Sequence, residues 1–113
     1  MPEMMTAVTL NSLLDTQATC ALIDVREAGE YNDAHIPGSS LVPRRQLEFR
    51  MTRLVPFKGT QVIVCDDDGR RAAPAAATLE RMGFGRVAVL EGGINRWTTE
   101  GYPTEWGVNV PSK

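Results

Sequence analysis

The sequence predicts a single α/β domain built around a largely parallel, buried sheet. Three observations support this fold class. The chain has 113 residues, which is the usual size of one domain. Short apolar runs alternate along it with stretches whose apolar residues recur at helical spacing. No internal repeat and no low-complexity linker divides the chain, so one domain accounts for it.

Apolar runs predict strands at residues 20–25, 41–42, 61–65 and 87–90. The run at 61–65 gives the strongest signal, because it is continuous and rich in β-branched residues. Continuous runs of this kind are typical of parallel strands that are covered by helices on both faces. In such sheets ligands bind outside the carboxyl ends of the strands. The loop that follows residue 65 is therefore the first place to look for a site.

Helical spacing predicts helices between these strands. The first is expected to have Thr9 as its N-cap and Leu10, Leu13 and Leu14 on one face. Further helices are expected over residues 26–34, 44–55, 72–82 and 94–100. Pro56 ends the helix expected over residues 44–55, and Gly83 suits the C-terminal cap of the helix expected over residues 72–82.

Composition excludes several classes of protein. A formal net charge of −2 argues against a dedicated nucleic-acid-binding domain, which is usually strongly basic. No apolar run approaches the ~20 residues of a membrane span, so no membrane partner is expected. The first residues lack the pattern of a signal peptide, which makes the cytoplasm the expected location. Two cysteines are too few for a disulfide scaffold and are treated as thiols.

The segment 65–71 joins the strongest strand to a helix and has the composition of an anion-binding loop. Backbone N–H groups converge at such a junction, and the helix dipole adds partial positive charge. The same field lowers the pKa of a thiol placed there and makes it nucleophilic. Cys65, Gly69, Arg70 and Arg71 suit the roles of nucleophile, tight turn and anion clamp. The alternative for Cys65 is a small buried apolar residue at a strand end.

Several short motifs, in the same order along the chain, resemble the rhodanese-like (sulfurtransferase) domain family. The first covers residues 22–27 with Glu30 and Tyr31, and continues into the turn at 35–39; the last covers 83–84 and 89–94 with Trp97. The resemblance extends from about residue 9 to residue 102. It implies a three-layer rhodanese-like domain over residues 1–103, with a central, mostly parallel five-stranded sheet flanked by helices. Residues 104–113 would then form a tail, as a linker to a further domain.

The resemblance also implies a chemistry and no cofactor. In active members a cysteine at the head of the loop accepts a sulfane sulfur from thiosulfate or a persulfide, and passes it to a nucleophile. The family loop usually runs Cys-x-x-Gly-x-Arg-Ser. Aligned on Gly69, that pattern places Arg71 at the arginine and Asp66 at the nucleophile. Aligned on Cys65 instead, it places Asp68 at the glycine and shifts the helix by one residue.

This departure predicts weak or absent sulfurtransferase activity. A carboxylate at position 66 cannot carry a persulfide, and its charge opposes bound thiosulfate. Successive strand residues point to opposite faces, so the sulfur of Cys65 is expected to point away from the centre of the loop. The acidic residues Asp66, Asp67 and Asp68 suit the positive end of a helix dipole. Three adjacent aspartates cannot all face one ion, so no metal is expected.

Three functional alternatives remain. The first is a sulfurtransferase that carries persulfide on Cys65 and takes a small sulfur-containing substrate. The second is a non-catalytic module that binds a protein partner or a neighbouring rhodanese domain. A remote third follows from the spacing Cys65-x5-Arg71, which resembles that of dual-specificity phosphatases and arsenate reductases. Charge repulsion from Asp66–Asp68 opposes an oxyanion substrate of that kind.

Other polar residues are expected to support the fold. Asp24 and Arg26 end the first predicted strand at the same carboxyl edge, and a buried Asp24 would need hydrogen-bond partners. The resemblance places His35, the single histidine, in a structural turn. Residues 44–58 carry five basic side chains against one acidic residue, Glu48. This segment is either a solvated helix face or a docking surface for an acidic partner.

Overall fold

The computed structural model describes residues 2–107. Its centre is one sheet with the strand order β1-β5-β4-β2-β3, in which every neighbouring pair is parallel. The strands are β1 (Glu3–Met5), β2 (Cys20–Asp24), β3 (Ser40–Leu41), β4 (Gln61–Cys65) and β5 (Val87–Leu90). This confirms the expected five-stranded parallel sheet and puts β4 at its middle.

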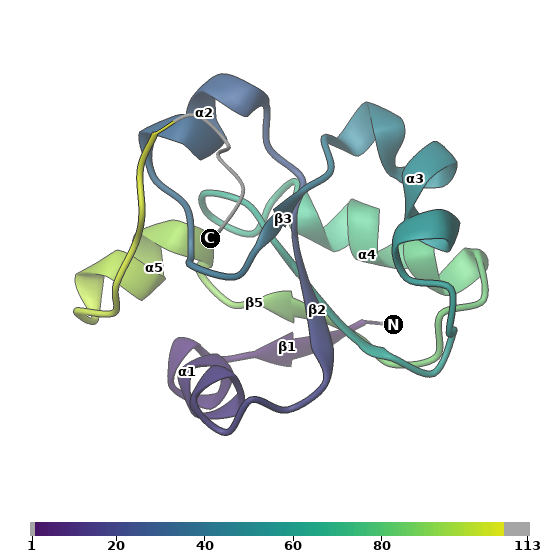
Figure 1. Cartoon of the computed structure of the whole chain (residues 1–113), viewed down its shortest axis with the longest axis horizontal. Coiled ribbons are helices and arrows are strands. Elements are labelled where there is room, and N and C mark those ends of the chain that lie inside the picture. The colour runs from purple at the N-terminus through teal and green to yellow at the C-terminus, as the bar shows by residue number, and fades with distance from the viewer. Residues whose placement is uncertain (1, 108–113) are drawn as a thin grey trace.

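Helices cover both faces of the sheet, which confirms the three-layer arrangement (Figure 1). They are α1 (Ala7–Asp15), α2 (Ala28–Asp33), the 3-10 turn η1 (Arg44–Gln46), α3 (Leu47–Leu54), α4 (Ala72–Arg81) and α5 (Gly93–Thr99). Helices α3 and α4 pack on one face, and α1 and α5 pack on the other. Within residues 2–107, no helix combines the length and the apolar character needed to cross a membrane.

Two details near the N-terminus differ from the sequence-based expectation. The expected N-cap Thr9 was wrong: Thr6 caps α1, and its side-chain oxygen accepts the backbone N–H of Thr9 at 3.1 Å. Thr6 has the extended backbone of a cap because it directly follows β1. That strand was missed, since Glu3–Met5 contains no β-branched residue. It forms by pairing with β5, with Met5 opposite Leu90.

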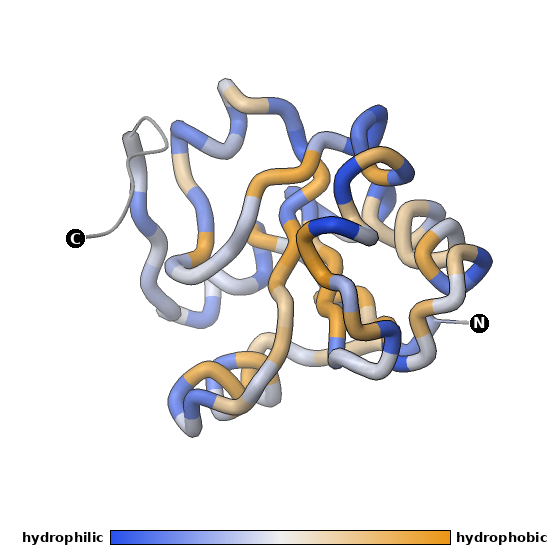
Figure 2. Tube along the Cα trace, turned by 45° about the vertical axis from the view of Figure 1, so that its right-hand side comes forward, coloured by the Kyte–Doolittle hydropathy of each residue, from blue (hydrophilic) through white to orange (hydrophobic). Residues whose placement is uncertain are grey.

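The side chains of β4 alternate between the two layers of the core. Val62 and Val64 belong to the apolar cluster beneath α3 and α4, whereas Ile63 and Cys65 belong to the cluster beneath α1 and α5. Hydrophobic residues accordingly concentrate along the central strands, and hydrophilic residues are more frequent at the periphery (Figure 2). Because alternation continues past the strand end, the residue after Cys65 is directed toward the α4 side.

Candidate functional site

The loop between β4 and α4 lies at the carboxyl edge of the central strand, where the sequence predicted a site. Its turn depends on Gly69, whose backbone φ of +98° lies in a region that side chains with a Cβ rarely adopt. The turn brings the first backbone amides of α4 back over the end of β4. The backbone therefore has the shape of an anion-binding loop. What the loop can bind depends on the group that lies among its converging amides.

The carboxylate of Asp66 occupies the centre of this loop. One oxygen accepts the backbone N–H of Gly69, and the other accepts those of Arg71 at 2.7 Å and Ala72 at 3.2 Å. Asp66 has no exposed surface. Burial raises the pKa of its carboxyl above the ordinary value, while the same three amides act in the opposite direction. The amides that would hold a bound anion already hold one that belongs to the chain.

Cys65 lies on the other side of the sheet from this centre. It is fully buried and belongs to an apolar cluster with Ile63, Leu90 and Trp97. Burial, followed by the negative charge of Asp24, raises the pKa of its thiol well above the ordinary value. Cys65 is thus a protonated thiol within the core, which is the opposite of a reactive thiolate. The second thiol, Cys20, lies at the start of β2 and is half-buried.

The arginines of the loop are paired with carboxylates. Arg71 contacts Glu30 of α2 through two hydrogen bonds of 3.1 and 2.9 Å, and Asp67 at 3.3 Å. These partners raise the pKa of Arg71, with Glu30 the largest cause. The side chain of Arg70 is 91% exposed and lies 3.7 Å from Asp68. The Nε of Arg71 also lies 4.0 Å from the carboxylate at the centre of the loop. Both guanidinium groups are therefore paired with carboxylates of the chain, and neither is an unpaired clamp.

The expectation that three adjacent aspartates cannot all face one point was wrong: one oxygen of each loop carboxylate lies within 4.8 Å of the others. Each of them already accepts a backbone N–H of the loop: Asp66 as described, Asp67 from Asp68, and Asp68 from Arg70. These bonds close the turn on itself. They account for the acidic cluster as loop structure, and we assign no metal to it.

A second helix, α5, holds the loop from its other side. The amides of Ile94 and Asn95 donate to the carbonyls of Asp66 and Asp67, each at 2.9 Å. A Cβ added to Gly93 would lie 2.5 Å from the carbonyl carbon and oxygen of Asp67, so only glycine permits this approach. The sequence pattern did not indicate this contact between Gly93 and the loop. The place of Gly93 in the closing motif was the available signal.

Asp24 and Arg26 form a buried ion pair beside the loop. Their closest charged atoms are 2.9 Å apart, and the Asp24 carboxylate also accepts the Arg26 backbone N–H. Arg26 additionally donates to the carbonyl of Ala34 at 2.6 Å. The pair thereby joins the end of β2 to the end of α2 and satisfies both buried charges.

His35 makes contacts on three sides. Its Nδ1 lies 2.8 Å from the carbonyl oxygen of Tyr31, and its ring stacks on the Tyr31 ring at 3.9 Å. Its Nε2 lies 3.3 Å from Glu105, and the two backbones exchange hydrogen bonds of 2.8 Å. Glu105 belongs to the expected tail 104–113, so the start of that segment lies against the domain. Val108 and Val110, also part of that expectation, lie outside the described residues.

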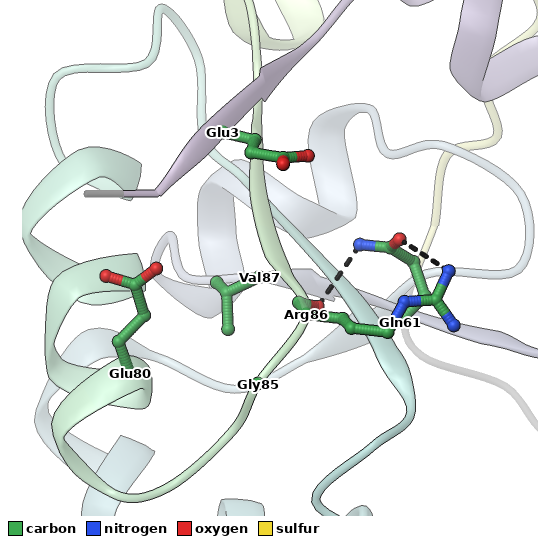
Figure 3. Close-up of a pocket in the computed structure, with 6 residues that line it drawn as sticks. All are labelled: Glu3, Gln61, Glu80, Gly85, Arg86 and Val87. Carbon is green, nitrogen blue, oxygen red and sulfur yellow. Dashed lines mark hydrogen bonds between the residues drawn. The ribbon is translucent and has the colours of Figure 1, made fainter.

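A polar hollow of about 280 Å³ lies at the opposite, amino edge of the sheet (Figure 3). Arg86 and Gln61 hydrogen-bond to each other across it, by 3.1 and 3.3 Å contacts. Glu3, Glu80, Gly85 and Val87 complete its lining. None of these residues belongs to the loop 65–71.

Comparison with known proteins identifies the family. The model of the rhodanese-like domain matches residues 6–100. The chain is 33% identical over 85 residues to the putative sulfur carrier protein YrkF of Bacillus subtilis, covering 75% of this chain and 45% of that one. It is 33% identical over 91 residues to a sulfurtransferase of Allochromatium vinosum, covering 80% and 82%.

Solved structures agree with this result. A thiosulfate sulfurtransferase from Pseudomonas aeruginosa superimposes with a TM-score of 0.88 at 32% identity, over 94% of this chain and 20% of that one. The chain thus spans less than half the length of YrkF and a fifth of this structure. The sheet order, the loop after the central strand and these matches together show that the chain belongs to the rhodanese-like domain family.

Proposed function

We propose that this chain is a non-catalytic rhodanese module, which binds a protein partner or supports a neighbouring domain instead of carrying sulfur. The observation that carries the proposal is the Asp66 carboxylate, which takes three backbone N–H groups at the centre of the loop. Sulfur transfer from thiosulfate requires a thiolate there: it attacks the outer sulfur, a new S–S bond forms, and sulfite leaves with the electron pair of the broken bond. An aspartate provides no such thiolate.

The position of Cys65 supports the same proposal. Its thiol is fully buried on the α1 and α5 side of the sheet, with a raised pKa. For Cys65 to act as the persulfide carrier, the strand end would have to rotate and the thiol would have to leave an apolar cluster. Relatives much longer than this chain support a role within a larger protein. On that basis we propose residues 1–103 as the module and 104–113 as a connection.

The test measures sulfur uptake by mass. The folded protein is incubated with thiosulfate, or with a small persulfide, and examined for the gain of one sulfur atom, alongside a thiocyanate assay with cyanide as acceptor. We expect neither a gain nor turnover. Asp66→Cys places a thiol among the loop amides and is expected to gain sulfur, because those amides lower the pKa of a thiol. Asp66→Cys combined with Cys65→Ser is expected to retain this gain.

The outcomes separate the alternatives. Sulfur on Cys65 of the unaltered protein, together with turnover abolished by Cys65→Ser, would establish the sulfurtransferase and overturn the proposal. Hydrolysis of a phosphate ester, abolished by the same substitution, would establish the phosphatase alternative. That alternative has the least support, because the Asp66 carboxylate stands where the oxyanion would bind. Circular dichroism of each variant verifies that it is folded.

A further inference from the structure

The outer face of α3 carries a mixed apolar and basic surface that the proposed loop chemistry does not use. Phe49, Arg50, Arg53 and Leu54 line an open groove of about 370 Å³. Phe49 is 84% exposed and Leu54 is 44% exposed. Exposed apolar groups of this size, gathered at one place, mark interaction surfaces more often than isolated ones do. We call these four residues the α3 groove.

The helix spacing explains why these residues share one face. Leu47, Met51 and Val55 recur every four residues and are buried in the cluster beneath α3 and α4. The residues of the α3 groove lie on the remaining face, where Phe49 is one turn from Arg53 and Arg50 is one turn from Leu54. Each arginine therefore has an apolar neighbour, and core packing does not account for the exposed set.

The charges of the α3 groove lack the acidic partners that nearby arginines have. Arg44 pairs with Glu48 at 3.2 Å, and Arg45 pairs with Glu27. Arg50 donates only to neutral acceptors, namely the carbonyl of Leu41 and the side chain of Gln46. Across residues 2–107, no carboxylate lies within ion-pair distance of Arg50 or Arg53. The α3 groove is thus positive and uncompensated within a chain of net charge −2.

We propose that the α3 groove docks an acidic segment of a partner protein that carries apolar side chains one helical turn apart. Carboxylates of the segment would pair with Arg50 and Arg53, and its apolar side chains would contact Phe49 and Leu54. A nucleic acid would satisfy the arginines but not Leu54, so a peptide fits the surface better. The inference deepens the proposed partner-binding function and rests on it. The test of docking measures peptide binding, whereas the test of the proposed function measures persulfide formation by mass, so the two readouts are separate.

The probe is a short polyglutamate peptide with two leucines one helical turn apart. It is added to the isotope-labelled full chain, and backbone amide shifts are followed by NMR. We expect the changes to concentrate at residues 49–54. Matched peptides replace the leucines by alanine, or the glutamates by glutamine, and each is expected to bind about tenfold more weakly.

Protein variants locate the contact. Phe49→Ala and Arg53→Ala are each expected to weaken binding about tenfold, and neither removes a buried side chain. Their controls lie on the opposite face of the sheet: Val8→Ala removes an exposed apolar group of α1, and Arg96→Ala removes one positive charge from α5. We expect the controls to change binding by less than about twofold.

Three outcomes would overturn the proposal. The first is no shift at residues 49–54 at peptide concentrations on the order of 1 mM. The second is equal weakening by the α3 substitutions and their controls, which would indicate non-specific charge attraction. The third is tighter binding of polyuridine RNA than of the peptide at the same residues. Each of these can occur whether or not Cys65 accepts sulfur, so the two proposals fail separately.

Discussion

Two adjacent residues, Cys65 and Asp66, determine the chemistry of the loop. Because strand residues alternate, Cys65 faces the layer of α1 and α5 and Asp66 faces the amides of α4. Persulfide chemistry needs a thiol at position 66, among the loop amides. The chain has its thiol at position 65 and a carboxylate at position 66. The residue at position 66 decides whether the loop can carry sulfur on a thiol or is occupied by a carboxylate of the chain.

The reactivity of the two thiols provides a prediction at the residue scale. Cys20 is half-buried, whereas Cys65 is fully buried and has a strongly raised pKa. In the native protein at pH 8 we expect iodoacetamide to modify Cys20 and to leave Cys65 unmodified. In urea both should react at similar rates. Peptide mass mapping after timed quenching measures this, and rapid native labelling of Cys65 would contradict its buried position.

Much of this residue-scale result was accessible from the sequence. Strand alternation alone predicts that the Cys65 side chain points away from the loop centre. Once the strand boundaries are known, alternate residues are assigned to opposite faces of the sheet. It does not predict that the Asp66 carboxylate accepts the N–H groups of Gly69, Arg71 and Ala72. That arrangement depends on the loop backbone, including the positive φ at Gly69, which a pattern of residue types does not specify.

At the scale of elements, α5 supports the loop as closely as α4 does. Its amides bind the carbonyls of Asp66 and Asp67, and the approach depends on Gly93. Long apolar runs and helical spacing predicted the central elements well, since packing and local preference agree there. The three-residue β1 was missed because it exists through pairing with β5, a contact between distant parts of the chain.

Replacement of Gly93 tests the contact between α5 and the loop. Gly93→Ala would place a Cβ 2.5 Å from the backbone of Asp67, at a backbone φ of +61°. We expect it to lower the free energy of unfolding by about 1–3 kcal/mol, through overpacking and backbone strain. Gly29→Ala is the control, because nothing lies within 4 Å of that position in α2. The control is expected to be neutral or slightly stabilising in urea denaturation.

At the scale of the whole molecule, a long-range ion pair ties α2 to the loop. Glu30 and Arg71 are 41 positions apart in sequence and make two hydrogen bonds. Arg71 is the largest cause that lowers the pKa of Glu30 in the folded state. The pair was not predicted: the sequence indicated an anion clamp for Arg71, and a pattern of residue types does not indicate a contact across 41 positions. Only the folded arrangement brings the first turn of α2 over residue 71.

This pair gives a pH-dependent prediction. A lowered folded-state pKa means that the unfolded chain binds more protons, so the stabilisation is present above the unfolded pKa of about 4.3 and is lost as the pH falls through the folded value. Both side chains are about two-fifths exposed, so solvent screening limits the effect. We expect Glu30→Gln to destabilise the protein by about 0.5–1 kcal/mol at pH 7.

The difference between Glu30→Gln and the unaltered protein should shrink as the pH falls through the lowered folded-state pKa of Glu30. Glu100→Gln is the matched control, since its pair with Arg96 lies within the exposed surface of a single helix. It is expected to change stability by less than about 0.5 kcal/mol. Urea denaturation over a series of pH values from 7 downward measures this, and a difference that does not shrink with falling pH would contradict the assigned ion pair.

The Asp66 carboxylate is tethered to the chain and competes with anions from solution for the backbone amides of the loop. A phosphate or thiosulfate ion from solution must displace a group that the backbone supplies at an effective concentration of roughly millimolar or more. Such ions should therefore leave the melting temperature of the unaltered protein unchanged at millimolar concentration. In Asp66→Ala the amides lose their internal anion. The same ions are then expected to raise the melting temperature, since a ligand that binds only the folded state stabilises it.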